Sequence, residues 1–164
     1  MNLKNIVSSL LPALSQRIQN WDGENIQTCL IFGSFANGKA NLNSDLDLLV
    51  ILKEFKYKSR QELWEDWHRV IESEWETWFK NSDFEPPPLS PVIRLKISVP
   101  QGSPLFWDMI EKKIILWDTD NFFQNYLEDL YRQMIEQGTK KRMIGGLPGW
   151  ELKPNHKKGD TIYI

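Results

Sequence analysis

The chain has 164 residues, which is enough for one domain with a hydrophobic core. Its formal net charge of −2 and its isoelectric point of about 5.7 exclude a protein that is basic over its whole surface, so nucleic acid is not expected as a general partner. No apolar stretch approaches the length of about 20 residues that a membrane-spanning helix needs. The single cysteine, Cys29, and an N-terminus without signal-peptide features predict a cytoplasmic protein in which Cys29 is a small core residue.

The N-terminal segment, residues 3–20, predicts a helix with one apolar face, and Pro12 is expected to bend or divide it. The apolar side chains that recur at helical spacing are Ile6, Leu10, Leu11, Leu14 and Ile18. The Asp22-Gly23 turn then leads into a first strand that begins at residue 26.

Residues 26–52 contain two apolar runs separated by a short polar segment. The first run stops at Gly33-Ser34, where glycine lets the backbone approach a ligand and the start of a short helix offers free N–H groups to an anion. The second run begins with Asp45 and Asp47, which point to the same face if both lie on a strand. Two adjacent carboxylates repel each other unless a cation lies between them. The pattern therefore predicts a site for a divalent ion such as Mg²⁺, shared with substrate phosphates.

Residues 60–80 predict a helix with one aromatic stripe. The side chains at the required 3-4-4-3 spacing are Trp64, Trp67, Ile71, Trp75 and Trp78. The stripe either packs on the sheet or serves in part as a partner surface, because tryptophan is enriched at interface hot spots. His68 lies beside it, and with His156 as the only other histidine a zinc site is not expected.

The middle of the chain predicts a loop, a strand and a helix. Three consecutive prolines make residues 81–91 a loop. Residues 92–99 alternate as a strand, with Ile93, Leu95 and Ile97 on one face and Arg94, Lys96 and Ser98 on the other. Ser103 is a suitable N-cap for a short helix over residues 104–112.

The last predicted elements are a short strand at residues 114–117 and a helix at residues 119–137, with Gly138 as its C-cap. Residues 139–164 carry six basic and two acidic side chains, against 14 and 20 in residues 1–138. We expect residues 1–138 to form the main domain. Residues 139–164 would be a basic tail that docks on the same domain through its apolar residues.

These motifs together resemble a known enzyme superfamily. Gly33-Ser34, Gly38 and the run Ser44-Asp45-Leu46-Asp47-Leu48-Leu49-Val50 are similar to the signature of the DNA polymerase β-like nucleotidyltransferases, and above all to the minimal nucleotidyltransferases (MNT proteins) of bacteria and archaea. The resemblance implies an α/β (α+β) fold, with a small mixed sheet flanked by helices, and makes residues 1–138 the nucleotidyltransferase domain. The end of the chain, from Trp150 onwards, resembles that of an MNT subgroup encoded beside HEPN proteins.

The resemblance also implies roles for particular residues. Asp45 and Asp47 would be the catalytic residues and would bind the Mg²⁺ that bridges the triphosphate of ATP. The backbone at Gly33 and the side chain of Ser34 would hold the terminal phosphates. Lys39 either reaches a phosphate or is an exposed loop residue. The full nucleotide-binding set implied is Gly33, Ser34, Gly38 and Lys39.

Two departures from the family pattern affect the expected activity. Asn37 stands where active relatives often have arginine. The superfamily usually adds a third carboxylate from a later strand, but residues 92–99 contain no acid. The remaining candidates are Asp83, Glu85 and Asp108, and loss of this ligand would slow two-metal catalysis strongly.

Three functions remain open on this basis. The first is an MNT-type antitoxin that transfers AMP from Mg-ATP to a tyrosine hydroxyl of a HEPN ribonuclease toxin, in a hetero-oligomer with it. The second is a weak or inactive enzyme that neutralises the same partner by binding, through the aromatic stripe or the basic tail. The third is nucleotide transfer to a small molecule or to an RNA end.

Overall fold

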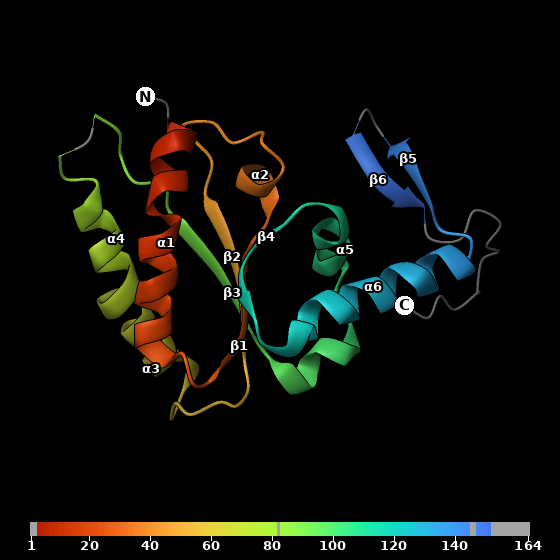
Figure 1. The fold of residues 1–164 in the computed structure, drawn as a ribbon, viewed down its shortest axis with the longest axis horizontal. Coiled ribbons are helices and arrows are strands. Elements are labelled where there is room, and N and C mark those ends of the chain that lie inside the picture. Colours follow the sequence, from red (N-terminus) through yellow and green to blue (C-terminus); the bar gives the residue numbers. More distant parts are fainter. Residues whose placement is uncertain (1–2, 82, 145–146, 152–164) are drawn as a thin grey trace.

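The structure, a computed structural model, describes residues 3–81, 83–144 and 147–151 of the chain. A four-stranded sheet with the strand order β3-β2-β1-β4 lies at its centre (Figure 1). Its strands are β1 (Ile26–Ile31), β2 (Leu46–Leu52), β3 (Leu89–Leu95) and β4 (Ile114–Asp118). β1 runs antiparallel to β2 and β4, whereas β2 and β3 are parallel. A mixed sheet between helices confirms the predicted α/β fold class.

Helices cover both faces of this sheet (Figure 1). One face carries α1 (Leu3–Asp22), α3 (Arg60–Trp67), the π-helix η1 (His68–Glu72) and α4 (Ser73–Trp78). The other face carries α5 (Pro104–Glu111) and α6 (Phe122–Glu136). The shorter elements are α2 (Gly33–Ala36), the 3-10 helices η2 (Lys96–Gln101) and η3 (Thr119–Asn121), and the hairpin strands β5 (Lys140–Ile144) and β6 (Leu147–Glu151).

The central strands β1 and β2 are buried because helices lie on both sides of them. Alternate side chains of β2 divide between two cores: Leu48 and Val50 pack toward α1 and α4, and Leu49 and Ile51 pack toward α5 and α6. Cys29 is fully buried in the first core, as predicted. Burial raises the pKa of its thiol far above the ordinary value, so the thiolate needed for reactivity does not form at neutral pH.

The N-terminal helix forms where it is predicted, but Pro12 does not divide it. Leu14 and Ile18 are fully buried, and Ile6 packs against the same core. α1 runs through Pro12 without being divided. None of the helices in the described part of the chain, α1 included, combines the length and the apolar character that a membrane span requires.

The third strand begins earlier than the predicted range of residues 92–99. The N–H of Leu46 donates to the carbonyl oxygen of Pro88 at 2.8 Å, and parallel pairing with β2 continues from there along β3. Pro91 lies inside the strand, where it is tolerated because β3 is at the edge of the sheet. The prediction of a loop for all of residues 81–91 is therefore wrong at its end, since proline excludes only central strands.

The third strand also ends earlier than predicted, because the backbone turns into η2. Ile97 is 81% exposed instead of facing the core. Lys96 reaches back across the sheet: its Nζ donates to Gln27 Oε1 at 2.9 Å and lies 4.7 Å from the ring centre of Phe122. These contacts join segments far apart in the sequence, so the local alternation of side chains could not indicate them.

The aromatic stripe predicted over residues 60–80 divides between core and surface. Trp67 and Trp75 are buried, and Trp78 packs against the same core. Trp64 is 42% exposed. The π-helix η1 interrupts the α-helical course here, and because a π turn contains more residues than an α turn, a strict 3.6-residue pattern does not continue through it.

The last helix begins later than the predicted residue 119, and Asp118 caps its first turn. The Asp118 carboxylate accepts the N–H of Phe123 at 3.0 Å and the N–H of Gln124 at 2.9 Å. It also accepts the hydroxyl of Thr28 at 2.6 Å. Because Thr28 is buried in β1, this one carboxylate connects α6 to the centre of the sheet.

The end of α6 agrees with the prediction of a glycine cap. Gly138 adopts φ +80°, and its N–H donates to the carbonyl oxygen of Ile135 at 2.9 Å. The β5–β6 hairpin follows, and the ring of Trp150 lies 6.4 Å from that of Tyr131 on α6. Residues 152–164, which include the apolar end of the predicted tail, lie outside the described residues. The division of the chain at residue 138 stays a prediction.

We expect Asp118→Ala to lower the free energy of unfolding by about 2 kcal/mol, because the first turn of α6 and the buried Thr28 hydroxyl both lose their acceptor. Urea unfolding followed by circular dichroism measures this change. Asp129→Ala is the matched control, since Asp129 is exposed on α6 and pairs with the exposed Arg132 at 3.0 Å, and its expected effect is below about 0.5 kcal/mol. Equal losses in the two variants would show that Asp118 is not a specific cap.

Candidate functional site

The turn after β1 brings the backbone to the end of the sheet in an unusual conformation. Phe32 is extended, and Gly33 then adopts φ +66°, a region that favours glycine. Gly38, the second glycine of the motif, has φ +78°. The N–H of Lys39 donates to the carbonyl oxygen of Ser34 at 2.9 Å and closes this segment into a compact loop. The helix predicted to start here has only four residues, so the turn itself is the main feature.

Gly33 lies directly against Asp47. A Cβ at Gly33 would be 2.1 Å from Asp47 Oδ2, which is far inside any permitted contact. The N–H of Phe32 donates to the carbonyl oxygen of Asp47 at 3.1 Å and holds the two segments together. The Gly-Ser turn and the second acid of the Asp-x-Asp motif therefore belong to one site.

Asp45 and Asp47 are positioned by the start of β2. The strand begins at Leu46, so Asp45 lies just before it and is exposed, rather than inside it as predicted. Asp47 is half-buried, and its burial, together with the charge of Asp45, raises the pKa of its carboxyl above the ordinary value. A bound divalent cation would offset both of these costs, so this pair of acids fits a metal such as Mg²⁺.

A third carboxylate does not join this pair in the described part of the chain. The residue of β3 paired with Asp47 is Ser90, and no residue of β3 is acidic. Asp83 and Glu85 are exposed in the segment before β3. Within the described ranges, no group of three or more acidic, histidine or cysteine side chains could hold a metal ion.

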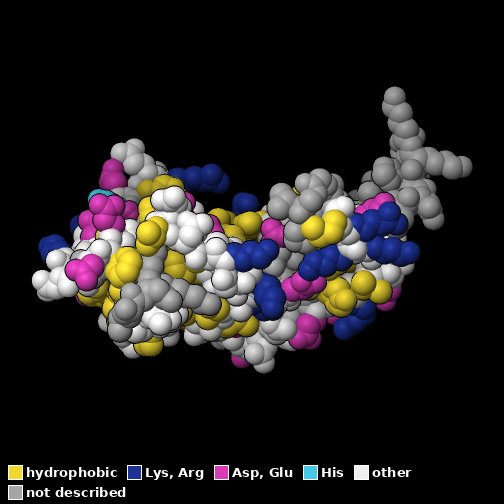
Figure 2. All heavy atoms as spheres, turned by 90° about the horizontal axis from the view of Figure 1, so that it is seen from above, with side chains coloured by type: hydrophobic (Ala, Val, Ile, Leu, Met, Phe, Trp, Pro, Cys, Tyr) yellow, Lys and Arg dark blue, Asp and Glu magenta, His cyan; other side chains and the backbone are white. Residues whose placement is uncertain are grey.

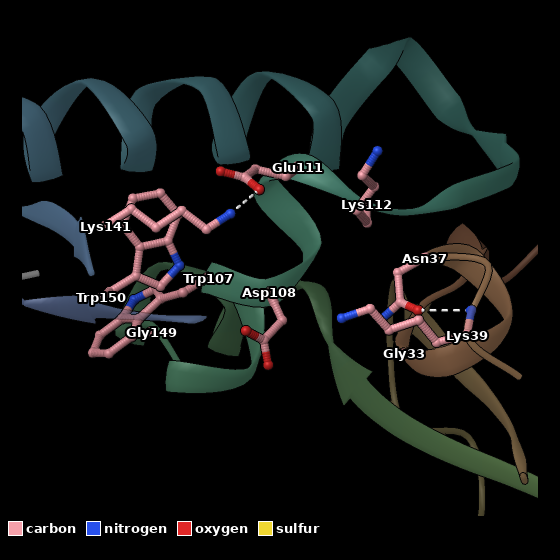
Figure 3. A pocket seen from close by; sticks show the side chains of 10 residues that line it. All are labelled: Gly33, Asn37, Lys39, Trp107, Asp108, Glu111, Lys112, Lys141, Gly149 and Trp150. Atoms are coloured by element: carbon pink, nitrogen blue, oxygen red, sulfur yellow. Dashed lines mark hydrogen bonds and ion pairs between the residues drawn. The ribbon is translucent and has the colours of Figure 1, made fainter. Parts of the chain in front are cut away.

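Asp108, the remaining candidate, faces a pocket of about 360 Å³ beside the Gly-Ser turn. Gly33, Asn37 and Lys39 line one side of this pocket, and Figure 3 shows the Lys39 side chain directed into it toward Asp108. Lys39 is exposed and also lines this pocket, so both interpretations of it, a phosphate ligand and an exposed loop residue, stay predictions. Asp108 shares the pocket with Gly33, and its side chain comes from α5.

The opposite side of the pocket consists of residues for which the sequence analysis predicted no place in the site. Trp107 comes from α5, and Lys141 and Trp150 come from the β5–β6 hairpin (Figure 3). Lys141 pairs with Glu111 of α5 and lies 5.6 Å from the ring centre of Trp150. These residues lie far apart in the chain, and only the packing of the hairpin near α5 brings them together.

Basic side chains are prominent on the side of the molecule shown in Figure 2. Lysine and arginine side chains gather there from the middle of the molecule to the hairpin end, with acidic side chains among them. The pocket is lined by three lysines, Lys39, Lys112 and Lys141, and by two acids, Asp108 and Glu111, so basic side chains are in slight excess. Such a distribution favours an anionic ligand.

We expect Gly33→Ala to lower the free energy of unfolding by about 2 to 4 kcal/mol, because it adds a clash with Asp47 to the backbone strain at positive φ. Gly138→Ala is the matched control: it has a similar φ, but nothing lies within 4 Å of the added Cβ, so about 1 kcal/mol is expected. Denaturant unfolding compares the two, and Mg²⁺ titration tests whether Gly33→Ala alone disturbs Asp47. Equal losses would contradict the contact between Gly33 and Asp47.

Comparisons with known proteins agree with this geometry. The family model described as "Polymerase beta, Nucleotidyltransferase" matches residues 16–86. A protein of Methanocaldococcus jannaschii named "Putative protein adenylyltransferase" is 29% identical over 128 residues, which cover 77% of this chain and 79% of that protein.

Solved structures show a looser likeness. A chain from a crystal structure of a toxin–antitoxin with AMP-PNP is 20% identical, with a TM-score of 0.45, over 76% of this chain and 92% of that one. A chain from a complex of a tri-AMPylated Shewanella oneidensis HEPN toxin with an MNT antitoxin is 15% identical, with a TM-score of 0.41, over 78% and 92%. The family match, the glycine turn and the paired acids coincide in residues 16–86, which are similar to a nucleotidyltransferase domain of the polymerase β type.

Proposed function

We propose that this protein transfers AMP from Mg-ATP to a hydroxyl group of another protein. The observation that carries the proposal is the contact between Gly33 and Asp47, because it joins a turn suited to phosphates with a carboxylate suited to a metal. The raised pKa of Asp47 supports it, since an acid that is partly buried and lies beside a like charge gains most from a bound cation. The similarity to the Methanocaldococcus jannaschii protein favours a protein as the acceptor.

The proposed roles follow from these positions. Asp45 and Asp47 would hold Mg²⁺, which supplies charge stabilisation to the triphosphate when bound. The backbone of Gly33 and Gly38 and the hydroxyl of Ser34 would orient the terminal phosphates. Lys39 faces the pocket and forms no ion pair with another described residue, so its ammonium is available to a phosphate.

The reaction forms one bond and breaks one. The acceptor oxygen bonds to the α-phosphorus, the bond from that phosphorus to the bridging oxygen breaks, and pyrophosphate leaves with that oxygen. The hydroxyl proton passes to water or to a base near the acceptor. Of the two acids that line the pocket, Glu111 is paired with Lys141, so we propose that Asp108 accepts the proton directly or through a water molecule.

We further propose that the acceptor is a tyrosine of a HEPN-family toxin and that the protein acts as its antitoxin. This rests on the resemblance of the Gly-Ser and Asp-x-Asp motifs, and of the end of the chain, to MNT proteins encoded beside HEPN proteins. In the described residues, the sheet and its helices form a single unit around the site, without a second unit to hold an acceptor.

A second candidate function is neutralisation of the same partner by binding alone. The observation that favours it is Ser90 opposite Asp47, since the neighbouring strand offers no acid to assist the attacking hydroxyl. Phe55 and Trp64, which are 41% and 42% exposed and line a common pocket, could contribute to such binding. In this case Mg-ATP would still bind, but transfer would be slow or absent.

We expect the protein, incubated with α-labelled ATP, Mg²⁺ and extract of its own host, to label one protein band. The Asp45→Asn/Asp47→Asn double variant should lose at least about 100-fold of this labelling, because the triphosphate loses its metal. The control is Asp129→Asn/Glu136→Gln, which removes two exposed charges of α6. Full labelling by the Asp45/Asp47 variant would overturn the enzymatic proposal, and label in RNA would replace the protein acceptor.

We expect Asp47→Asn to have opposite effects on stability in the two states of the protein: no loss without ligand, and a loss when Mg-ATP is present. A raised folded-state pKa means that the charged form is disfavoured, and stability falls as the pH rises through that pKa. The neutral variant should therefore be at least as stable as the natural protein at pH 7 without ligand. Mg-ATP at 100 times its Kd adds about 2.7 kcal/mol to the natural protein, and this gain should vanish in the variant. Thermal unfolding checks both signs, and an undiminished gain would exclude Asp47 as a metal ligand.

A further inference from the structure

We propose that Trp107 and Trp150 form the stacking site for the base of the bound nucleotide. The inference rests on the proposed function, which places the phosphates of the nucleotide at the Gly-Ser turn. It adds a binding site for the base, which neither the Gly-Ser nor the Asp-x-Asp motif provides. The pocket beside Gly33 has these two indole rings on its far side (Figure 3). A flat aromatic base is the ligand group that such rings hold best.

Both indoles are held by neighbouring residues and are only partly covered. Trp107 and Trp150 are each half-buried, and both pack against the core between the sheet and α6. The ring of Tyr131 meets that of Trp150 in an edge-to-face contact at 6.4 Å. Ring surface therefore remains open to the pocket, while little conformational entropy is lost when a base stacks on it.

The charges of the pocket match the two ends of a nucleotide. On the turn side, the Lys39 ammonium is free of ion pairs with the described residues and suits the anionic phosphates. On the tryptophan side, Lys141 is neutralised by Glu111, so this end suits an uncharged base. Asp108 lies between the two ends, where its carboxylate can accept a hydrogen bond from an exocyclic amino group or from a ribose hydroxyl.

The size of the pocket fits this assignment. At about 360 Å³ it lies in the range of about 300 to 1,000 Å³ that is usual for small-molecule sites. Gly33, Trp107 and Trp150 line the same pocket, so a ligand whose phosphates lie at the turn can extend to the indoles within it.

The test compares two ligands by isothermal titration calorimetry: Mg-ATP and Mg-tripolyphosphate, which has the phosphates without the base. Trp107→Leu and Trp150→Leu keep apolar bulk but remove the stacking surface, and Trp107→Phe restores an aromatic ring. Trp64→Leu is the matched control, since Trp64 is exposed on α3 and lines a different pocket.

We expect each leucine variant to weaken Mg-ATP binding by about 10- to 100-fold and to leave Mg-tripolyphosphate binding unchanged. Trp107→Phe should recover most of the ATP affinity, and Trp64→Leu should bind both ligands normally. Unchanged ATP affinity in the leucine variants, or an equal loss for both ligands, would overturn the stacking site and leave the phosphate site standing. Failure of the natural protein to bind either ligand would overturn the proposed function and the stacking site with it.

Discussion

The absence of a side chain at Gly33 is the constraint on which the site depends. The chain leaves β1 and must pass within contact distance of the Asp47 carboxylate on the neighbouring strand. Any Cβ at this point would occupy the position of that carboxylate, and any other residue would also be strained at φ +66°. The Asp47 carboxylate can therefore occupy its position only if residue 33 is glycine, although the two residues are 14 positions apart in the sequence.

In the protein without a bound cation, the negative charge on Asp47 is electrostatically unfavourable. Asp47 is partly withdrawn from water and lies near Asp45, and both effects disfavour its charge. Sites of this kind are stable only because the surrounding structure fixes them. Here the fixing elements are β1 and β2, which are buried on both faces, and the hydrogen bond from Phe32 to Asp47.

The sequence was informative where a feature depends on neighbouring residues. The Gly33-Ser34 turn, the acids at positions 45 and 47 and the cap at Gly138 all depend on local backbone geometry, and local patterns indicated them. The course of the first two strands was predictable for the same reason, since their apolar runs are continuous.

The sequence was uninformative where a feature depends on contacts between distant segments. The start of β3 depends on its pairing with β2, and the role of Asp118 on its contact with Thr28. Trp107 and Trp150 look like ordinary apolar residues of a helix and a tail until the hairpin brings them to one pocket. Sequence spacing cannot predict that such residues meet, because the number of residues between them depends on the helices and strands that lie between them.

The construction of the pocket from separate segments has a consequence for how this protein can diversify. The groups suited to phosphates and metal come from one short stretch, residues 33–47, whereas the opposite wall comes from α5 and the β5–β6 hairpin. Substitutions in the wall can alter which molecule fits without touching the acids, because the two parts are encoded independently. A substitution at Trp150 in the hairpin therefore reshapes the wall opposite the turn and leaves Asp45 and Asp47 in place.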